Sequence, residues 1–85
     1  MNTERVNAGR AHPQPGDIYR HFKGNNYVII VTAKHSENGE CIVVYQALYG
    51  ERAVWYRSLD NFLETLGDKE EETSYYRFEK IIGVD

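Results

Sequence analysis

The stretch NYVIIVTAKHSENGECIVVYQALY, residues 26–49, decides the fold because two strand-like runs flank one turn. Both runs are rich in valine, isoleucine and tyrosine, which favour strands. Between them, SENGE at 36–40 contains asparagine and glycine, the residues that tolerate the positive φ of a tight turn. The stretch therefore predicts a β-hairpin, and its runs YVIIV and CIVVY predict the most buried strands of the protein.

Strand signals continue on both sides of this hairpin. GDIYRHF at 16–22 precedes a KGNN turn, and RAVWYRS at 52–58 follows an LYGER turn, so four strands of an antiparallel meander are expected. A fifth strand, SYYRFEKII at 74–82, is expected near the carboxyl end.

One segment has helical character, SLDNFLETL at 58–66, in which Ser58 can cap the first turn. Four apolar residues recur there at helical spacing: Leu59, Phe62, Leu63 and Leu66. Because about nine residues form only a marginal helix alone, packing against one end of the sheet must hold it. Together these signals predict a mainly β fold, a small SH3-like antiparallel barrel of about five strands with one short helix or 3-10 turn.

The domain organisation follows from where the apolar residues begin. MNTERVNAGRAHPQP shows no apolar periodicity, which predicts a flexible leader over residues 1–15 and one domain over residues 16–85. No run approaches the ~18 apolar residues of a membrane span, and the amino terminus lacks the apolar core of a secretion signal. A cytoplasmic protein that does not bind membranes is the expectation.

Composition narrows the chemistry. The lone Cys41 has no internal disulfide partner, and with three scattered histidines it offers no zinc pattern, so no metal is expected. Glycines occur singly at turns and form no phosphate-binding loop, so no cofactor is expected. The net charge of −3, concentrated towards the carboxyl end, argues against a general nucleic-acid binder but leaves room for a local basic face.

Four motifs occur in order between Pro15 and Leu66: a YRHFKGN-Y opening, an A-HSE turn, a VVY-ALYGE strand and a W-R-L--F closing segment. In these the chain resembles a family of small bacterial proteins known as domain of unknown function 1653. The resemblance implies an SH3-like β-barrel and implies no activity. The chain has Ser58 and Asn61 where the family pattern usually has proline and methionine.

The string YRHFKGNNY, residues 19–27, is open to two interpretations. Its cations and rings favour a surface for phosphate, carboxylate or stacked bases. Alternatively, the rings belong to the core or the rim of the barrel, and the remainder is an ordinary hairpin turn. The residues concerned are Tyr19, Arg20, His21, Lys23 and Tyr27. A strand requires neither Arg20 nor His21, which favours the first interpretation.

KHSENGE, residues 34–40, contains His35, Ser36 and Glu37, the residue types of a catalytic triad. Three consecutive residues diverge, however, whereas triads converge through the fold, so a locally bonded turn is the simpler interpretation. A cross-strand pair of His21 with His35 is the remaining alternative.

LYGERAVWYR, residues 48–57, is the second candidate site. Tyr49, Trp55 and Arg57 can form a shallow aromatic shelf of the kind that binds peptides or methylated cations. The alternative is that Trp55, the one tryptophan of the chain, fills the core.

These patterns favour a non-catalytic binding module. A protein segment, proline-rich or positively charged, is the favoured partner because the chain is acidic, and single-stranded RNA or DNA is the first alternative. An enzyme or accessory domain that uses His21 and His35 is the second, although 85 residues leave little room for a buried active site. The candidate surface comprises Tyr19, Arg20, His21, Lys23, Tyr27, His35, Tyr49, Trp55 and Arg57.

Overall fold

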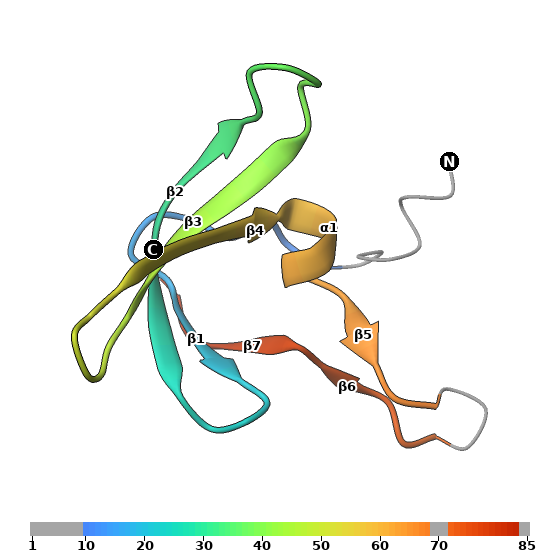
Figure 1. Ribbon diagram of the computed structural model, residues 1–85. Helices are drawn as coiled ribbons and strands as arrows, with labels where there is room; N and C mark the ends of the chain where they lie inside the picture. The colour runs from blue at the N-terminus through green and yellow to red at the C-terminus, as the bar shows by residue number, and fades with distance from the viewer. Residues whose placement is uncertain (1–9, 69–71, 84–85) are drawn as a thin grey trace.

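The computed structural model describes residues 10–68 and 72–83, and the protein is mainly β, as predicted (Figure 1). The elements in chain order are β1 (Ile18–His21), β2 (Asn26–Lys34), β3 (Cys41–Ala47), β4 (Val54–Ser58), α1 (Leu59–Phe62), β5 (Thr65–Leu66), β6 (Tyr75–Tyr76) and β7 (Phe78–Ile82). A five-stranded sheet has the order β4-β3-β2-β1-β7, and β5 and β6 form a separate pair. The predicted meander of four antiparallel strands is confirmed.

The sheet has two free ends, β4 and β7. β7 pairs with β1, and the chain turns into α1 directly after β4. Within the described residues no backbone pairing joins β4 to β7, so the sheet is not closed into a barrel by strand pairing. β4 therefore presents one edge of its backbone outward.

The predicted turns lie where the glycines and asparagines place them. Gly24 and Gly39 have φ values of 110° and 74°, a region that residues with a Cβ rarely adopt. The amide of Gly24 donates to the carbonyl of His21, and that of Gly39 donates to the carbonyl of His35. These turns fix the registers of the first two hairpins.

The helix is shorter than its apolar spacing predicts. Ser58 caps α1, since its Oγ accepts from the amide of Asn61 at 3.1 Å, but the helix ends at Phe62 instead of continuing to residue 66. Thr65 and Leu66 are extended and pair with β6. The predicted last strand is accordingly two strands, β6 and β7, which are separated by Arg77.

Arg77 fixes this junction. Its amide donates to the carbonyl of Glu64, and its Nη2 pairs with Glu64 Oε1 at 2.6 Å. Its Nε also donates to the carbonyl of Asn61 at 3.0 Å. These bonds hold the segment after α1 extended, because they engage the groups that another helical turn would use.

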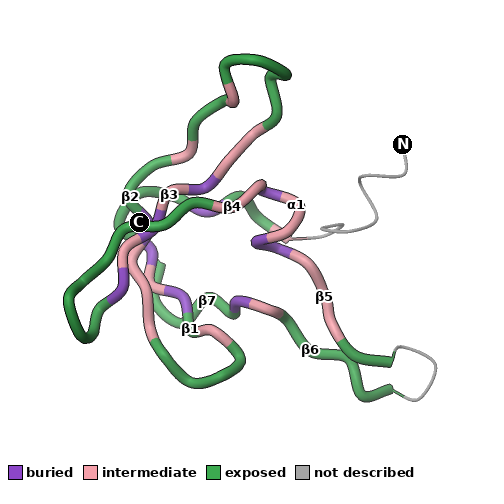
Figure 2. The backbone as a smooth tube through the Cα atoms, in the orientation of Figure 1, coloured by how far each residue is buried: buried purple, intermediate pink, exposed green. Residues whose placement is uncertain are grey.

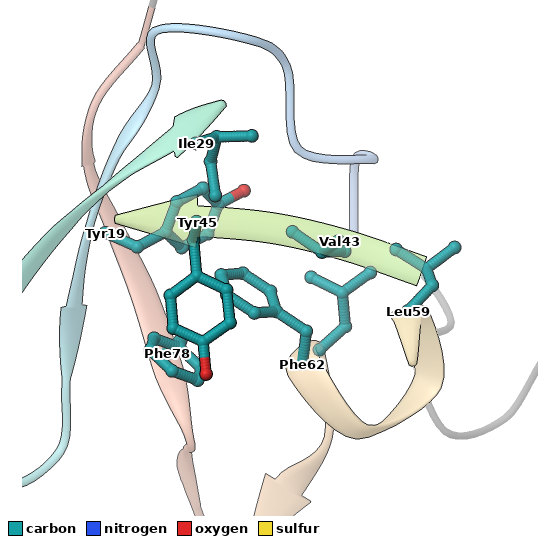
Figure 3. Close-up of a cluster of buried hydrophobic side chains, with 8 residues drawn as sticks. Tyr19, Ile29, Val43, Tyr45, Leu59, Phe62 and Phe78 are labelled. Carbon is teal, nitrogen blue, oxygen red and sulfur yellow. The ribbon is translucent and has the colours of Figure 1, made fainter. Parts of the chain in front are cut away.

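The core lies between α1 and one face of the sheet, which we call the inner face (Figure 3). The rings of Phe62 and Phe78 stack with centroids 4.1 Å apart and an interplanar angle of 8°. Figure 2 shows buried segments on α1 and along β3. The buried cluster comprises Tyr19, Ile29, Val43, Tyr45, Leu59, Phe62, Leu63 and Phe78.

The continuous apolar runs are not buried on both faces. In β3 burial alternates, with Val43 and Tyr45 directed into the core. In β2 the register shifts between Ile29 and Val31, and both Ile30 and Val31 are exposed. The prediction that YVIIV and CIVVY mark the most buried strands therefore holds for Ile29 of β2 and for the inward residues of β3, but not for Ile30 and Val31.

The amino-terminal segment contacts the domain where it is described. Residues 1–9 of the predicted leader lie outside the described residues, and the boundary at residue 15 stays a prediction. Arg10 donates from Nη1 to the carbonyl of Leu63 at 2.8 Å and from Nη2 to that of Phe78 at 2.7 Å, and Pro13 is buried. Over residues 10–68 and 72–83, no helix has both the length and the apolarity that crossing a membrane requires.

Candidate functional site

A pocket of about 230 Å³ opens on the inner face of the sheet beside β4. Among the described residues, five aromatic side chains, one histidine and one arginine line it, and no carboxylate does. We call it the aromatic pocket, and its lining residues are His21, Tyr27, Tyr45, Tyr49, Trp55, Arg57 and Phe78. The fold thus brings together five of the nine residues that the sequence nominated, from both candidate stretches.

Trp55 forms the outer wall of the pocket. It pairs with Tyr45 in the register of β3 and β4, so its ring is on the inner face, yet 54% of the residue is exposed. The alternative that Trp55 fills the core is wrong. Phe62 and Phe78 occupy the centre instead, because β4 lies at the end of the sheet.

Arg57 lies two residues further along the same face and is held by neutral acceptors. Its Nε donates to the hydroxyl of Tyr45 at 2.8 Å, and its Nη1 donates to Asn61 Oδ1 at 2.5 Å. Its guanidinium carbon is 5.5 Å from the centroid of Phe78. In the described parts of the chain, this partly buried cation forms no salt bridge.

Two tyrosines close one side of the pocket. The hydroxyls of Tyr27 and Tyr49 are 2.7 Å apart, and their rings meet edge to face at 82°. Burial, followed by this hydrogen bond, raises the pKa of Tyr27 to about 12. The Tyr27 hydroxyl therefore keeps its proton at neutral pH, and the single hydrogen bond between the two oxygens uses one hydroxyl hydrogen of the pair.

His21 contributes a neutral ring. Its Nδ1 accepts from the amide of Lys23 at 3.1 Å, and its ring meets Phe78 edge to face at 4.9 Å. Burial lowers the pKa of His21, and the charges of Arg57, Lys23 and Arg77 lower it further. Because Nδ1 accepts a hydrogen bond, the proton of the neutral imidazole is on Nε2.

His35 makes the same bond in the next turn. Its Nδ1 accepts from the amide of Glu37 at 3.1 Å, and Asn38 Oδ1 accepts from the amide of Glu40 at 2.8 Å. The interpretation of KHSENGE as a locally bonded turn is thus confirmed. His35 and His21 lie at opposite ends of β2, since Arg20 pairs with Asn26, so the two histidines do not form a pair.

The other three nominated residues lie outside the pocket. Tyr19 is buried in the core and meets Phe62 edge to face at 5.1 Å, so it is not part of an exposed surface. Arg20 is exposed and directs Nε to Asn26 Oδ1 at 3.4 Å. Lys23 is exposed in the first turn.

Three residues of the candidate site were not nominated from the sequence. Tyr45 and Phe78 lie in the pocket floor, and Asn61 orients Arg57. Alternation along CIVVYQA was a usable signal for Tyr45, because residues two apart share a face. Asn61 carried a signal only as a departure from the family pattern. No group of three or more metal-ligating side chains occurs in the described residues.

Comparison with known proteins identifies the family that this chain resembles. A family model described as a protein of unknown function (DUF1653) matches residues 17–80. The crystal structure of a protein belonging to DUF1653 from Bordetella bronchiseptica matches with a TM-score of 0.68 and 31% identity, covering 85% of this chain and 91% of that chain. No curated protein matches. The matching descriptions name no ligand, so the geometry must supply the functional argument.

Proposed function

The chain belongs to the DUF1653 family, and we propose that it is a non-catalytic binding module for an extended protein segment. The observation that carries this proposal is the half-exposed Trp55 on the free strand β4, where it walls the aromatic pocket. Burying a large aromatic residue usually stabilises a small domain. A tryptophan that remains exposed beside a pocket is typical of a contact surface.

The outer edge of β4 can accept another strand. The amide of Ala47 donates to the carbonyl of Ala53, so alternation directs the N–H and C=O groups of Val54 and Tyr56 away from β3. Natural edge strands are usually protected by lysine, proline or a bulge, and the sequence VWY at 54–56 has none of these. Val54, Trp55 and Tyr56 are all exposed.

Strand addition would use both the free edge of β4 and the aromatic pocket beside it. Backbone hydrogen bonds to β4 would supply affinity, and alternate side chains of the added strand would reach the inner face beside Trp55 and Arg57. The edge of β4 would then bind the backbone of an extended segment whatever its sequence, and the pocket would select one of its side chains. Single-stranded nucleic acid is the second candidate, because Trp55 and Tyr49 present exposed rings near Arg57.

The test is an amide correlation spectrum of the labelled full chain, titrated with acetyl-Thr-Val-Thr-Glu-Thr-Val-amide. We expect shifts of the Val54 and Tyr56 amides together with the Trp55 indole N–H. In Val54→Pro, which removes one outward N–H from an edge position, the affinity should fall at least about tenfold. Val54→Thr keeps the N–H at the same position and should bind like the wild type.

Two results would contradict strand addition. One is a Val54→Pro protein that is folded and binds the peptide with unchanged affinity. The other is a peptide titration in which the β4 amides do not move, while an oligothymidylate shifts Trp55 and Tyr49 and added salt reverses the shift. The second result would favour single-stranded nucleic acid.

A further inference from the structure

We infer that the aromatic pocket binds a carboxylate carried by the bound segment and that Arg57 receives it. This inference rests on the proposed function and names the chemistry of the side chain that the pocket selects. It depends on an imbalance in the pocket: the part of the lining that the structure describes presents several hydrogen-bond donors and no carboxylate.

Arg57 supplies the main donors. A guanidinium has five N–H groups, and the described residues engage two of them, one by Tyr45 and one by Asn61. Both N–H groups of Nη2 and the second of Nη1 are left. The two existing bonds fix the plane of the guanidinium, and a fixed guanidinium matches the two oxygens of a carboxylate.

The neighbouring polar groups also have donor hydrogens for which residues 10–68 and 72–83 provide no acceptor. The hydroxyl of Tyr45 accepts from Arg57, so its own hydrogen is available to a ligand. One hydroxyl hydrogen of the Tyr27 and Tyr49 pair is likewise available, as is the Nε2 proton of His21. An ionised carboxylate accepts hydrogen bonds without donating any, so it complements this set of donors.

Local charge leads to the same ligand. The net charge of −3 favours a positively charged partner, but Arg57 is a pocket residue, and Lys23 and Arg77 are close enough to His21 to act on its protonation. A cationic side chain would meet repulsion from Arg57 inside the pocket. A single carboxylate complements the positive charge of Arg57. A nucleic acid carries one negative charge per nucleotide, and the net charge of −3 would repel it.

The placement of Arg57 on β4 makes the contact geometrically direct. Arg57 and Trp55 are two residues apart on the inner face, the separation at which side chains of a paired strand alternate. A glutamate opposite Arg57 therefore lies next to an apolar residue opposite Trp55. The segment that fits this pattern is extended, with a glutamate or aspartate two residues from an apolar side chain.

The experiment compares three peptides on the full-length protein: acetyl-Thr-Val-Thr-Glu-Thr-Val-amide and its counterparts with glutamine or lysine in place of glutamate. Dissociation constants come from the Trp55 indole shift at neutral pH. We expect the glutamate peptide to bind at least about tenfold more tightly than the glutamine peptide, and the lysine peptide to bind most weakly.

Two variants assign the preference to Arg57. In Arg57→Gln the glutamate and glutamine peptides should bind equally, because the cation is gone. In Arg57→Lys part of the preference should return through charge alone, without the paired N–H geometry. Arg20→Gln, which changes an exposed arginine outside the pocket, should keep the full preference. A dispersed amide spectrum establishes that each variant is folded.

The outcomes separate this inference from the function on which it rests. If the glutamate and glutamine peptides shift β4 equally, strand binding holds and the carboxylate inference is overturned. If the preference persists in folded Arg57→Gln, another group receives the carboxylate and the role of Arg57 is overturned. If none of the three peptides binds, the proposed function itself fails, and the inference fails with it.

Discussion

Two arginines of the described chain lie against aromatic rings, and their hydrogen bonds differ. Arg10 lies 3.7 Å from the ring centroid of Tyr76, and both of its terminal nitrogens donate to backbone carbonyls, those of Leu63 and Phe78. Arg57 lies 5.5 Å from the centroid of Phe78 and donates to side chains, those of Tyr45 and Asn61.

The two arginines differ in the groups that their hydrogen bonds join. The acceptors of Arg10 are the residue that follows α1 and the first residue of β7, so its bonds join segments that are otherwise distant in the chain. Arg57 bonds the side chains of Tyr45 and Asn61, which orient it, and it lines the aromatic pocket. Arg10 is therefore a structural tie between backbone segments, whereas Arg57 has the contacts expected of the receptor that we propose.

The largest expected effect is at Phe78, which touches both arginines through its carbonyl and its ring. Phe78→Ala removes a fully buried ring stacked on Phe62 and should cost about 3–5 kcal/mol of unfolding free energy, measured by urea denaturation. Phe22→Ala makes the same chemical change at an exposed ring and should cost about 1 kcal/mol or less. Equal losses would show that the core is not centred on Phe78.

Arg10→Met should have the next largest effect on stability. It leaves the carbonyls of Leu63 and Phe78 without their charged donors, for an expected loss of about 2 kcal/mol by thermal or urea unfolding. Arg20→Met changes an exposed arginine with one long hydrogen bond and should stay within about 0.5 kcal/mol of the wild type. The folded Arg10→Met protein should bind the glutamate peptide normally; weakened binding would remove the distinction between tie and receptor.

Arg57→Met should change stability less, by about 1 kcal/mol or below, because water in the open pocket can replace Arg57 at the Tyr45 hydroxyl. The same urea experiment measures it beside Arg10→Met. A loss as large as that of Arg10→Met would make Arg57 a second structural tie.

The smallest expected effect is a pH dependence at His21. The pKa of His21 is lowered in the folded protein, so its contribution to stability is present above the unfolded value of about 6.5 and is lost as pH falls below it. His21→Asn keeps an acceptor for the amide of Lys23 but does not titrate in this range. The unfolding free energy of the wild type should therefore fall more steeply than that of His21→Asn between pH 7 and 5. Parallel curves would contradict the lowered pKa.

Much of the fold was predictable because its signals are local. The turns around Gly24 and Gly39 specify hairpins, and Ser58 specifies the start of α1, since each depends only on residues nearby in the chain. The end of α1 was not predictable from spacing. Leu66 continues the helical pattern, but the bonds of Arg77 to Glu64 are tertiary and override it.

The candidate site was predictable in its residue types and only partly in its membership. The enrichment in rings and charges correctly placed Trp55 and Arg57 in the pocket lining. It also nominated Tyr19, whose side chain is buried in the core. A strand does not require His21, but the turn does, because Nδ1 of this histidine accepts from the amide of Lys23 two residues later. Which face of β1 is buried depends on the pairing with β7, whose residues are about sixty positions away.

The contacts of Arg10 also impose an order in time. They connect residues 53 and 68 positions apart, whereas each of the first two hairpins closes over a few residues. Short loops close within microseconds and long-range contacts carry a greater entropic cost, so the meander can form before Arg10 reaches its carbonyls. Loss of Arg10 should then speed unfolding and leave the refolding rate nearly unchanged, which makes this residue a determinant of how long the folded state lasts.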